Sequence, residues 1–145
     1  MTRDRRQRTG RALVGLVSAT TAVGALAADL LVPATARQHM RNPRWPGHAK
    51  FHDAQYIVMS ALLGGLGLRM VTTRRGDPDR NLLAAAAVVS TPWLGMYGAA
   101  LFPGTTLIDE EFRAGAPAVE GNIAAGTVCL ALLAAGVGLA RPSVG

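Results

Sequence analysis

Four long apolar segments occupy most of this chain, and their length limits what it can fold into. They cover about residues 12–32, 47–71, 82–102 and 122–140, and a helix needs roughly twenty residues to cross the hydrocarbon core of a bilayer. Inside a bilayer every backbone polar group must be satisfied internally, so such segments cross as helices. The sequence therefore predicts an all-α bundle of four transmembrane helices, in a single integral membrane domain over residues 1–145.

Charged residues lie mainly between these segments. Half of the residues are hydrophobic and 17% are charged, a distribution expected where lipid solvates most of a chain. The net charge is +6, but the basic residues gather at segment ends, where they meet lipid headgroups rather than form one continuous nucleic-acid surface. We therefore expect membrane lipids as partners and no nucleic acid. The only cysteine, Cys129, lies in the last segment, so an intrachain disulfide is excluded.

The first segment has two interpretations. A basic stretch from Arg3 to Arg11, an apolar core and the run Ala25-Leu26-Ala27 are also typical of a cleaved signal peptide. However, three further segments follow, and one helix face carries only small or polar residues, as expected inside a bundle: Ser18, Ala22, Ala25 and Asp29. We therefore expect this segment to be retained as the first span.

The basic residues also predict the orientation of the chain. With the N-terminus inside, ten basic residues near the spans lie on the inner side, and five lie on the outer side: Arg37, Arg41, Arg44, Lys50 and Arg113. The positive-inside rule then places both termini in the cytoplasm. Arg, Ala and Gly are abundant, which suggests a bacterial protein. We expect a multi-pass protein of the bacterial plasma membrane.

The first connection and the start of the second span hold residues that could carry chemistry. His48 and His52 stand four residues apart and so share a helix face, and Asp53 follows directly. Asp29, at the end of the first span, belongs to the same outer side. We single out His48, His52, Asp53 and Asp29 as candidate catalytic residues. Further carboxylates of the third connection belong to this side: Asp109, Glu110, Glu111 and Glu120.

Aromatic and polar side chains near the same side could line a pocket. Trp93 and Tyr97 stand four residues apart just beyond Pro92, a residue that kinks helices. Packing or anchoring at the membrane interface is their simpler explanation. The candidate ligand-binding residues are Trp45, Phe51, Gln55, Tyr56, Trp93 and Tyr97. Our leading hypothesis is an outer-side polar pocket that holds a small apolar or lipid-like molecule.

Other functions are open on the same residues. His48 and His52 could bind a metal with Asp29, or a carboxylate from Asp109 to Glu111, as a third ligand. The spacing is common, however, and Ala49 replaces the glutamate of the H-E-x-x-H motif. We assign neither metal nor cofactor. A second hypothesis is a membrane enzyme for proton transfer on a lipid-like substrate, with His52 as base and Asp29 or Asp53 as acid. A third is a structural or accessory subunit whose Gly and Ala faces support helix association, including a homo-oligomer. In the simplest interpretation the histidines only cap the helix or meet lipid phosphate.

The run from Trp45 to His52, W-P-G-H-A-K-F-H, resembles the W-P-x-H-A-[KR]-F-H motif of a family of small four-pass membrane proteins with no assigned activity. The resemblance covers most of the chain by layout, is specific in this run, and implies a role for Trp45, His48, Phe51 and His52. More loosely, the chain is similar to the EXPERA-domain proteins, which include the emopamil-binding sterol isomerases. Those are small helical bundles with a His and carboxylates in an intramembrane cavity. Their second span carries H-x-x-x-E, whereas here the acid is replaced by His52.

Overall fold

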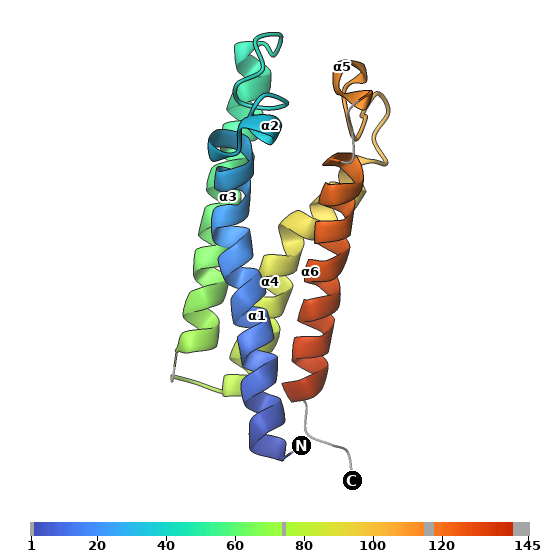
Figure 1. The fold of residues 1–145 in the computed structure, drawn as a ribbon. Helices are drawn as coiled ribbons and strands as arrows, with labels where there is room; N and C mark the ends of the chain where they lie inside the picture. The colour runs from blue at the N-terminus through green and yellow to red at the C-terminus, as the bar shows by residue number, and fades with distance from the viewer. Residues whose placement is uncertain (1, 74, 115–117, 141–145) are drawn as a thin grey trace.

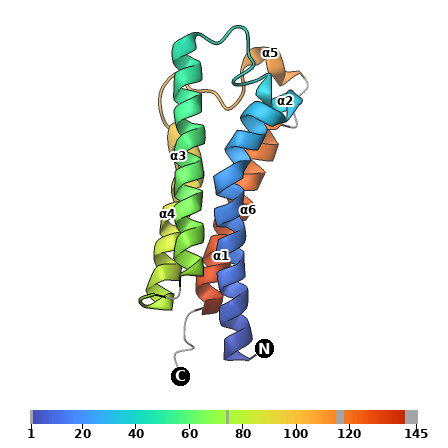
Figure 2. The same ribbon diagram turned by 90° about the vertical axis from the view of Figure 1, so that its left-hand side faces the viewer.

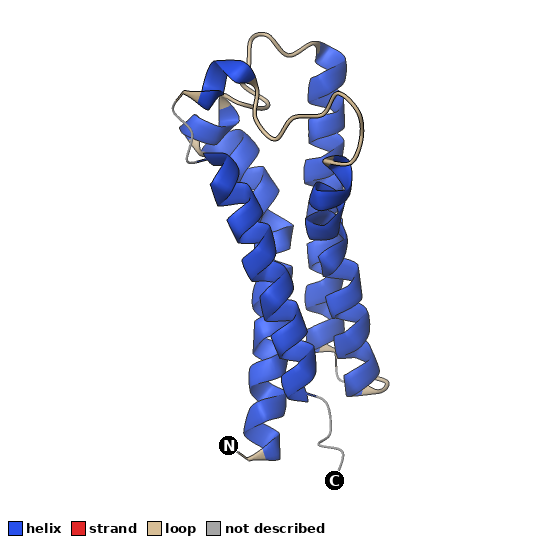
Figure 3. Ribbon diagram, turned by 90° about the vertical axis from the view of Figure 1, so that its right-hand side faces the viewer, coloured by secondary structure: helices blue, strands red, loops and turns tan. Residues whose placement is uncertain are grey.

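Four long helices stand side by side in an elongated bundle (Figure 1). The computed structural model describes residues 2–73, 75–114 and 118–140, and this part of the chain contains helices and no strand (Figure 3). The long helices are α1 (Arg3–Leu26), α3 (Gly47–Thr72), α4 (Pro78–Ala99) and α6 (Ala118–Ala140), and the short elements are the π-helical turn η1 (Ala27–Leu31), α2 (Pro33–Ala36) and α5 (Glu110–Arg113). In the described residues four helices are long and apolar enough to cross a membrane. The predicted all-α, four-helix fold class is therefore confirmed.

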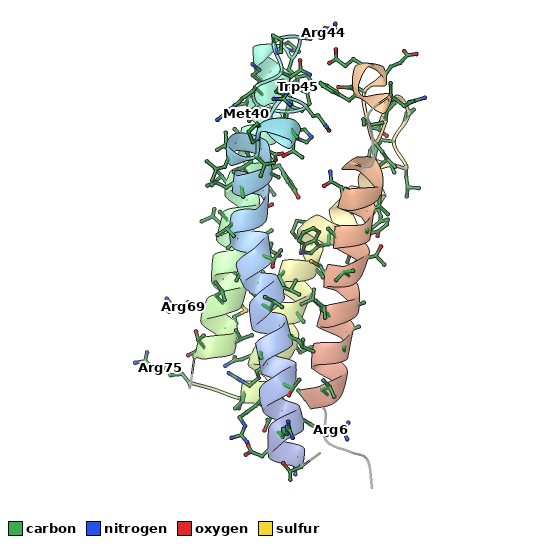
Figure 4. All side chains as sticks on the ribbon, viewed as in Figure 1. Arg6, Met40, Arg44, Trp45, Arg69 and Arg75 are labelled. Atoms are coloured by element: carbon green, nitrogen blue, oxygen red, sulfur yellow. The ribbon has the colours of Figure 1, made fainter. Side chains whose placement is uncertain are left out.

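The two ends of the bundle differ in character. The start of α1, the end of α6 and the turn between α3 and α4 lie at one end (Figures 1 and 2). Arg6, Arg69 and Arg75 lie there (Figure 4), and we call it the basic end. The opposite end carries α2, α5 and the connections around them, including Arg44 and Trp45, and we call it the cap end.

Helix ends extend beyond the predicted spans where a polar cap stabilises them. The first helix begins at Arg3 rather than near residue 12, because the Thr2 side chain accepts a hydrogen bond from the Arg5 amide at 3.4 Å. Asp77 caps α4 in the same way, accepting from the Asp79 and Arg80 amides at 2.9 and 3.2 Å. These first turns project past the apolar segments and carry charge.

Small residues fill the interior of the bundle, while large apolar side chains face outward. The buried set is rich in Val, Ala, Ser and Thr: Val14, Val17, Ser18, Thr21, Ser60, Ala85 and Val89 are among its members. Leu16, Leu62 and Leu83 are 57%, 68% and 52% exposed. Lipid rather than water is the favourable solvent for such a surface, and small interior residues are typical of helices that associate in lipid.

Helix α1 is central, because glycines let neighbouring backbones approach it. It packs along both α3 and α6, and α4 completes the bundle against all three. A Cβ atom added at Gly64 of α3 would lie 2.3 Å from the Ala22 amide nitrogen, and one added at Gly10 would lie 2.4 Å from the Gly136 carbonyl oxygen. At both glycines the neighbouring backbone is therefore in close contact, and a side chain there would force the two helices apart.

Candidate functional site

Asp29 is a buried carboxylate at the cap end of the first span. It is 5% exposed and lies in η1, where the helix widens into a single π-helical turn. Residues of the following connection satisfy carbonyls of this turn, since Arg41 donates to the Leu30 carbonyl at 2.8 Å and Thr35 donates to that of Ala28. A π turn frequently marks a functional site, and so does an ionisable side chain inside a span.

His39, from the connection between α2 and α3, faces this carboxylate. Its Nδ1 atom lies 2.7 Å from Oδ1 of Asp29, with the ring half-buried. The contact is an ion pair whenever His39 is protonated. The close contact with Asp29, and then the charges of Asp29 and Asp53, raise the pKa of His39 above its ordinary value of 6.5, although burial of the ring opposes them.

Asp53, in the second turn of α3, completes a group that we call the Asp29–His39–Asp53 cluster. Its charge acts on His39, and its Oδ2 atom is buried without a hydrogen-bond partner in the described residues. An unpartnered buried oxygen is costly, so this atom favours a donor brought by a ligand or by water. Chemically, a protonated His39 can donate a proton in this cluster and a neutral one can accept it.

The two histidines singled out by the sequence lie on another face of α3. Both rings are exposed, and their polar contacts are with each other and with Gln55. Phe51, beside them, is 62% exposed. Of the four candidate catalytic residues, the structure brings Asp29 and Asp53 together around His39, and it does not bring His48 and His52 into that cluster.

A narrow groove lies one helical turn further into the span, between α1, α3 and α4. Its lining is Thr20, Thr21, Ala25, Tyr56, Ser60, Pro92 and Trp93. The Trp93 indole donates to the Thr21 hydroxyl at 3.0 Å, whereas the Ser60 hydroxyl, 2% exposed, lies near that of Tyr56 and makes no hydrogen bond of ordinary geometry in the described residues. The groove volume is about 10 Å³, which is room for one water-sized group.

The predicted ligand-binding residues are divided by the structure. Tyr56 and Trp93 line the groove. Tyr97 instead bonds through its hydroxyl to Thr127 of α6 at 2.6 Å, a helix-packing contact. Trp45 places its ring edge-on to His39, with centroids 5.6 Å apart, and its indole nitrogen lies 3.5 Å from Asp109. Phe51 and Gln55 lie on the exposed face with His48 and His52.

A polar network ties the first connection to the third across the cap end. The Asn42 side chain, 1% exposed, donates to Glu111 at 3.2 Å and accepts from the Arg44 amide at 2.8 Å. Arg44 forms an ion pair with Glu111. Thus two of the predicted carboxylates, Asp109 and Glu111, hold the connections together instead of facing Asp29, while the side chain of Glu120 lies outside the described residues.

Sequence reasoning missed His39 and most of the groove. His39 lies in a connection without periodicity, and Thr20, Thr21 and Ser60 are small polar residues in apolar helices. The one available signal was that Tyr56 and Ser60 are four residues apart, on one face of the second span.

Within the described ranges, no three His, Cys, Asp or Glu side chains gather in a geometry suited to a metal ion.

Comparisons with known protein families, with curated proteins and with solved structures gave no match.

Proposed function

We propose that this small, four-helix membrane protein binds a lipid-like amphipathic molecule at the groove between α1, α3 and α4. The observation that carries the proposal is the Ser60 hydroxyl, which is almost fully buried at the groove and makes no hydrogen bond of ordinary geometry in the described residues. In lipid no water is at hand to satisfy such a group, so a ligand that brings a polar atom gains from meeting it.

The dimensions of the groove define how the ligand is held. Its volume admits one small group, so the polar head enters while the chain lies along the lipid-facing surface. Tyr56, at the groove, is 43% exposed and therefore borders the lipid. The ring of Trp93 offers a flat apolar wall on the α4 side.

The charge of the neighbouring cluster selects the polar head. Two carboxyl groups, Asp29 and Asp53, stand with one imidazole, so the cluster offers more hydrogen-bond acceptors than donors. Such a cluster repels a second carboxylate and attracts hydrogen-bond donors. The ligand is therefore a long-chain alcohol, a sterol-like alcohol or an amine, and not a fatty acid.

Trp93 makes this proposal testable by fluorescence. In a Trp45→Phe background Trp93 is the only tryptophan, and a brominated long-chain alcohol that binds at the groove should quench it. Ser60→Leu should raise the concentration of brominated alcohol needed for half-maximal quenching about tenfold. It fills the groove and removes one hydrogen bond worth about 1 kcal/mol. Ser90→Leu is the matched control, since Ser90 of α4 is outside the groove and bonds to the Ala87 carbonyl. Equal quenching in both leucine variants, or equal binding of the matched brominated fatty acid, would refute the proposal.

We further propose that the basic end faces the cytoplasm of a bacterial cell. The described basic side chains are denser there than at the cap end, which agrees with the positive-inside rule (Figure 4).

Single cysteines test this orientation in a Cys129→Ala background. Ala34, exposed in α2, and Thr2, exposed before α1, lie at opposite ends, and replacing either leaves the charge unchanged. A membrane-impermeant maleimide should label Ala34→Cys on intact cells, but Thr2→Cys only after lysis. The reverse pattern would overturn the orientation.

A further inference from the structure

His48 and His52 form an exposed pair at the cap end of α3 that neither the groove nor the Asp29–His39–Asp53 cluster uses. They stand one helical turn apart, with Nε2 atoms 3.1 Å from each other. The ring centroids are 4.5 Å apart and the ring planes nearly perpendicular, at 81°. The two Nε2 atoms therefore face each other at hydrogen-bond distance.

Gln55 decides which nitrogen of His52 carries the proton. The Nδ1 atom of His52 lies 3.3 Å from the Gln55 side-chain oxygen, and an amide oxygen can only accept. Nδ1 is therefore the donor, and a neutral His52 presents the lone pair of Nε2 toward His48. Two lone pairs repel at this distance, so either an Nε2–H group of His48 donates to His52 or a metal ion stands between the two nitrogens.

The spacing suits a metal ion. Two Zn–N bonds of about 2.0–2.1 Å place their nitrogens roughly 3.3–3.4 Å apart at a tetrahedral angle, and about 2.9 Å apart at a right angle. The observed 3.1 Å falls between the two. Gln55 also acts as the outer partner that metal-binding histidines usually have, because its hydrogen bond fixes the ring orientation and raises the basicity of Nε2.

We propose that His48 and His52 bind one divalent transition-metal ion of the kind that prefers imidazole, such as Zn²⁺ or Cu²⁺. The protein supplies two ligands, and water fills the remaining positions, so the ion is exchangeable rather than structural. Sequence spacing alone was too common to assign this site; the additional observations are the close approach of the two Nε2 atoms and the Gln55 contact. The site stands apart from the proposed ligand groove, and either can fail without the other.

Zn²⁺ itself is the probe for this site. Tag-free protein in detergent is titrated with Zn²⁺ in competition with a chromophoric chelator, and we expect one ion per chain. His48→Gln and His52→Gln should each weaken binding roughly tenfold or more, because each removes one of two ligands. His39→Gln is the matched control and should bind as the unmodified protein does, since His39 faces Asp29 instead.

Copper provides an independent readout. The electron paramagnetic resonance spectrum of bound Cu²⁺ should show coupling to two imidazole nitrogens in the unmodified protein and to one in either single variant. If His39→Gln does not fold, Lys50→Gln, on the same turns of α3, replaces it as the control. Zn²⁺ binding that survives His48→Gln and His52→Gln, or that falls equally in the control, would overturn the proposal.

Discussion

Gly64→Leu is expected to separate α1 from α3 and to destabilise the bundle by roughly 3 kcal/mol or more, above the usual cost of overpacking a core. A Cβ atom at Gly64 would lie 2.3 Å from the Ala22 amide nitrogen and 2.6 Å from the Ser18 carbonyl oxygen. These are backbone atoms, which cannot rotate aside as a side chain can. The two helices must therefore move apart along the interface that holds the buried Ser18 and Thr21.

The adjacent glycine is the matched control. A Cβ atom at Gly65 would meet no other atom within 4 Å, so Gly65→Leu should not lower the free energy of unfolding, and the higher helix propensity of leucine should raise it slightly. For the two alanine variants, the change in the free energy of unfolding should even differ in sign. Alanine favours a helix over glycine by about 1 kcal/mol, so Gly65→Ala should stabilise slightly while Gly64→Ala destabilises.

Unfolding by SDS in mixed micelles, followed by the loss of helical circular dichroism, measures these differences. Equal midpoints for the two leucine variants would show that α1 and α3 do not approach at Gly64.

The fold was predictable because segment length and hydropathy determine how many helices cross a bilayer. Helix ends were less predictable, since the start at Arg3 depends on a single hydrogen bond that the Thr2 side chain accepts from the Arg5 amide. The π-helical turn around Asp29 was not predictable at all. It depends on the Thr35 and Arg41 side chains of the next connection, which satisfy carbonyls at that turn, and no periodicity encodes such a contact.

The sequence predicted the end of the bundle at which the candidate site lies, but not which helix faces form it. Chain topology places Asp29, His48, His52 and Asp53 at the same end. However, successive residues on a helix point about 100° apart, so His52 faces outward with His48 while its neighbour Asp53 acts on His39. A residue in an irregular connection, such as His39, has no periodicity from which a direction could be inferred.

His39→Gln is expected to cost stability near the lower end of the roughly 3–5 kcal/mol that follows when one partner of a buried ion pair is removed. Asp29 is 5% exposed and would lose the imidazole 2.7 Å away. The cost falls toward the lower end because the His39 side chain is itself 28% exposed. In the double variant Asp29→Asn with His39→Gln, much of the loss should be recovered, since no unpaired charge then remains buried.

The same residue should make stability depend on pH in a defined direction. The pKa of His39 is raised in the folded protein above 6.5 by Asp29 first and Asp53 second. The folded state therefore binds the proton more tightly than the unfolded state does, and the stabilisation is complete below about pH 6.5. It is lost as pH rises through the higher, folded pKa. Midpoints of SDS unfolding should accordingly fall as the pH rises above about 6.5 in the unmodified protein.

His39→Gln should flatten that pH dependence, and this outcome separates the ion pair from other sources of titration. The charged groups that act on the His39 ring are Asp29 from η1 and Asp53 from α3, so Asp29→Asn should weaken the dependence as well. The control is a chain with both His48→Gln and His52→Gln, whose exposed rings contact neither carboxylate. If that control loses the dependence while His39→Gln keeps it, the titrating group is the exposed pair, and the cap end is not held by His39. If His39→Gln alone is flat, the imidazole between two carboxylates is what joins the first connection to the end of the first span, beside the groove that we assign to the ligand.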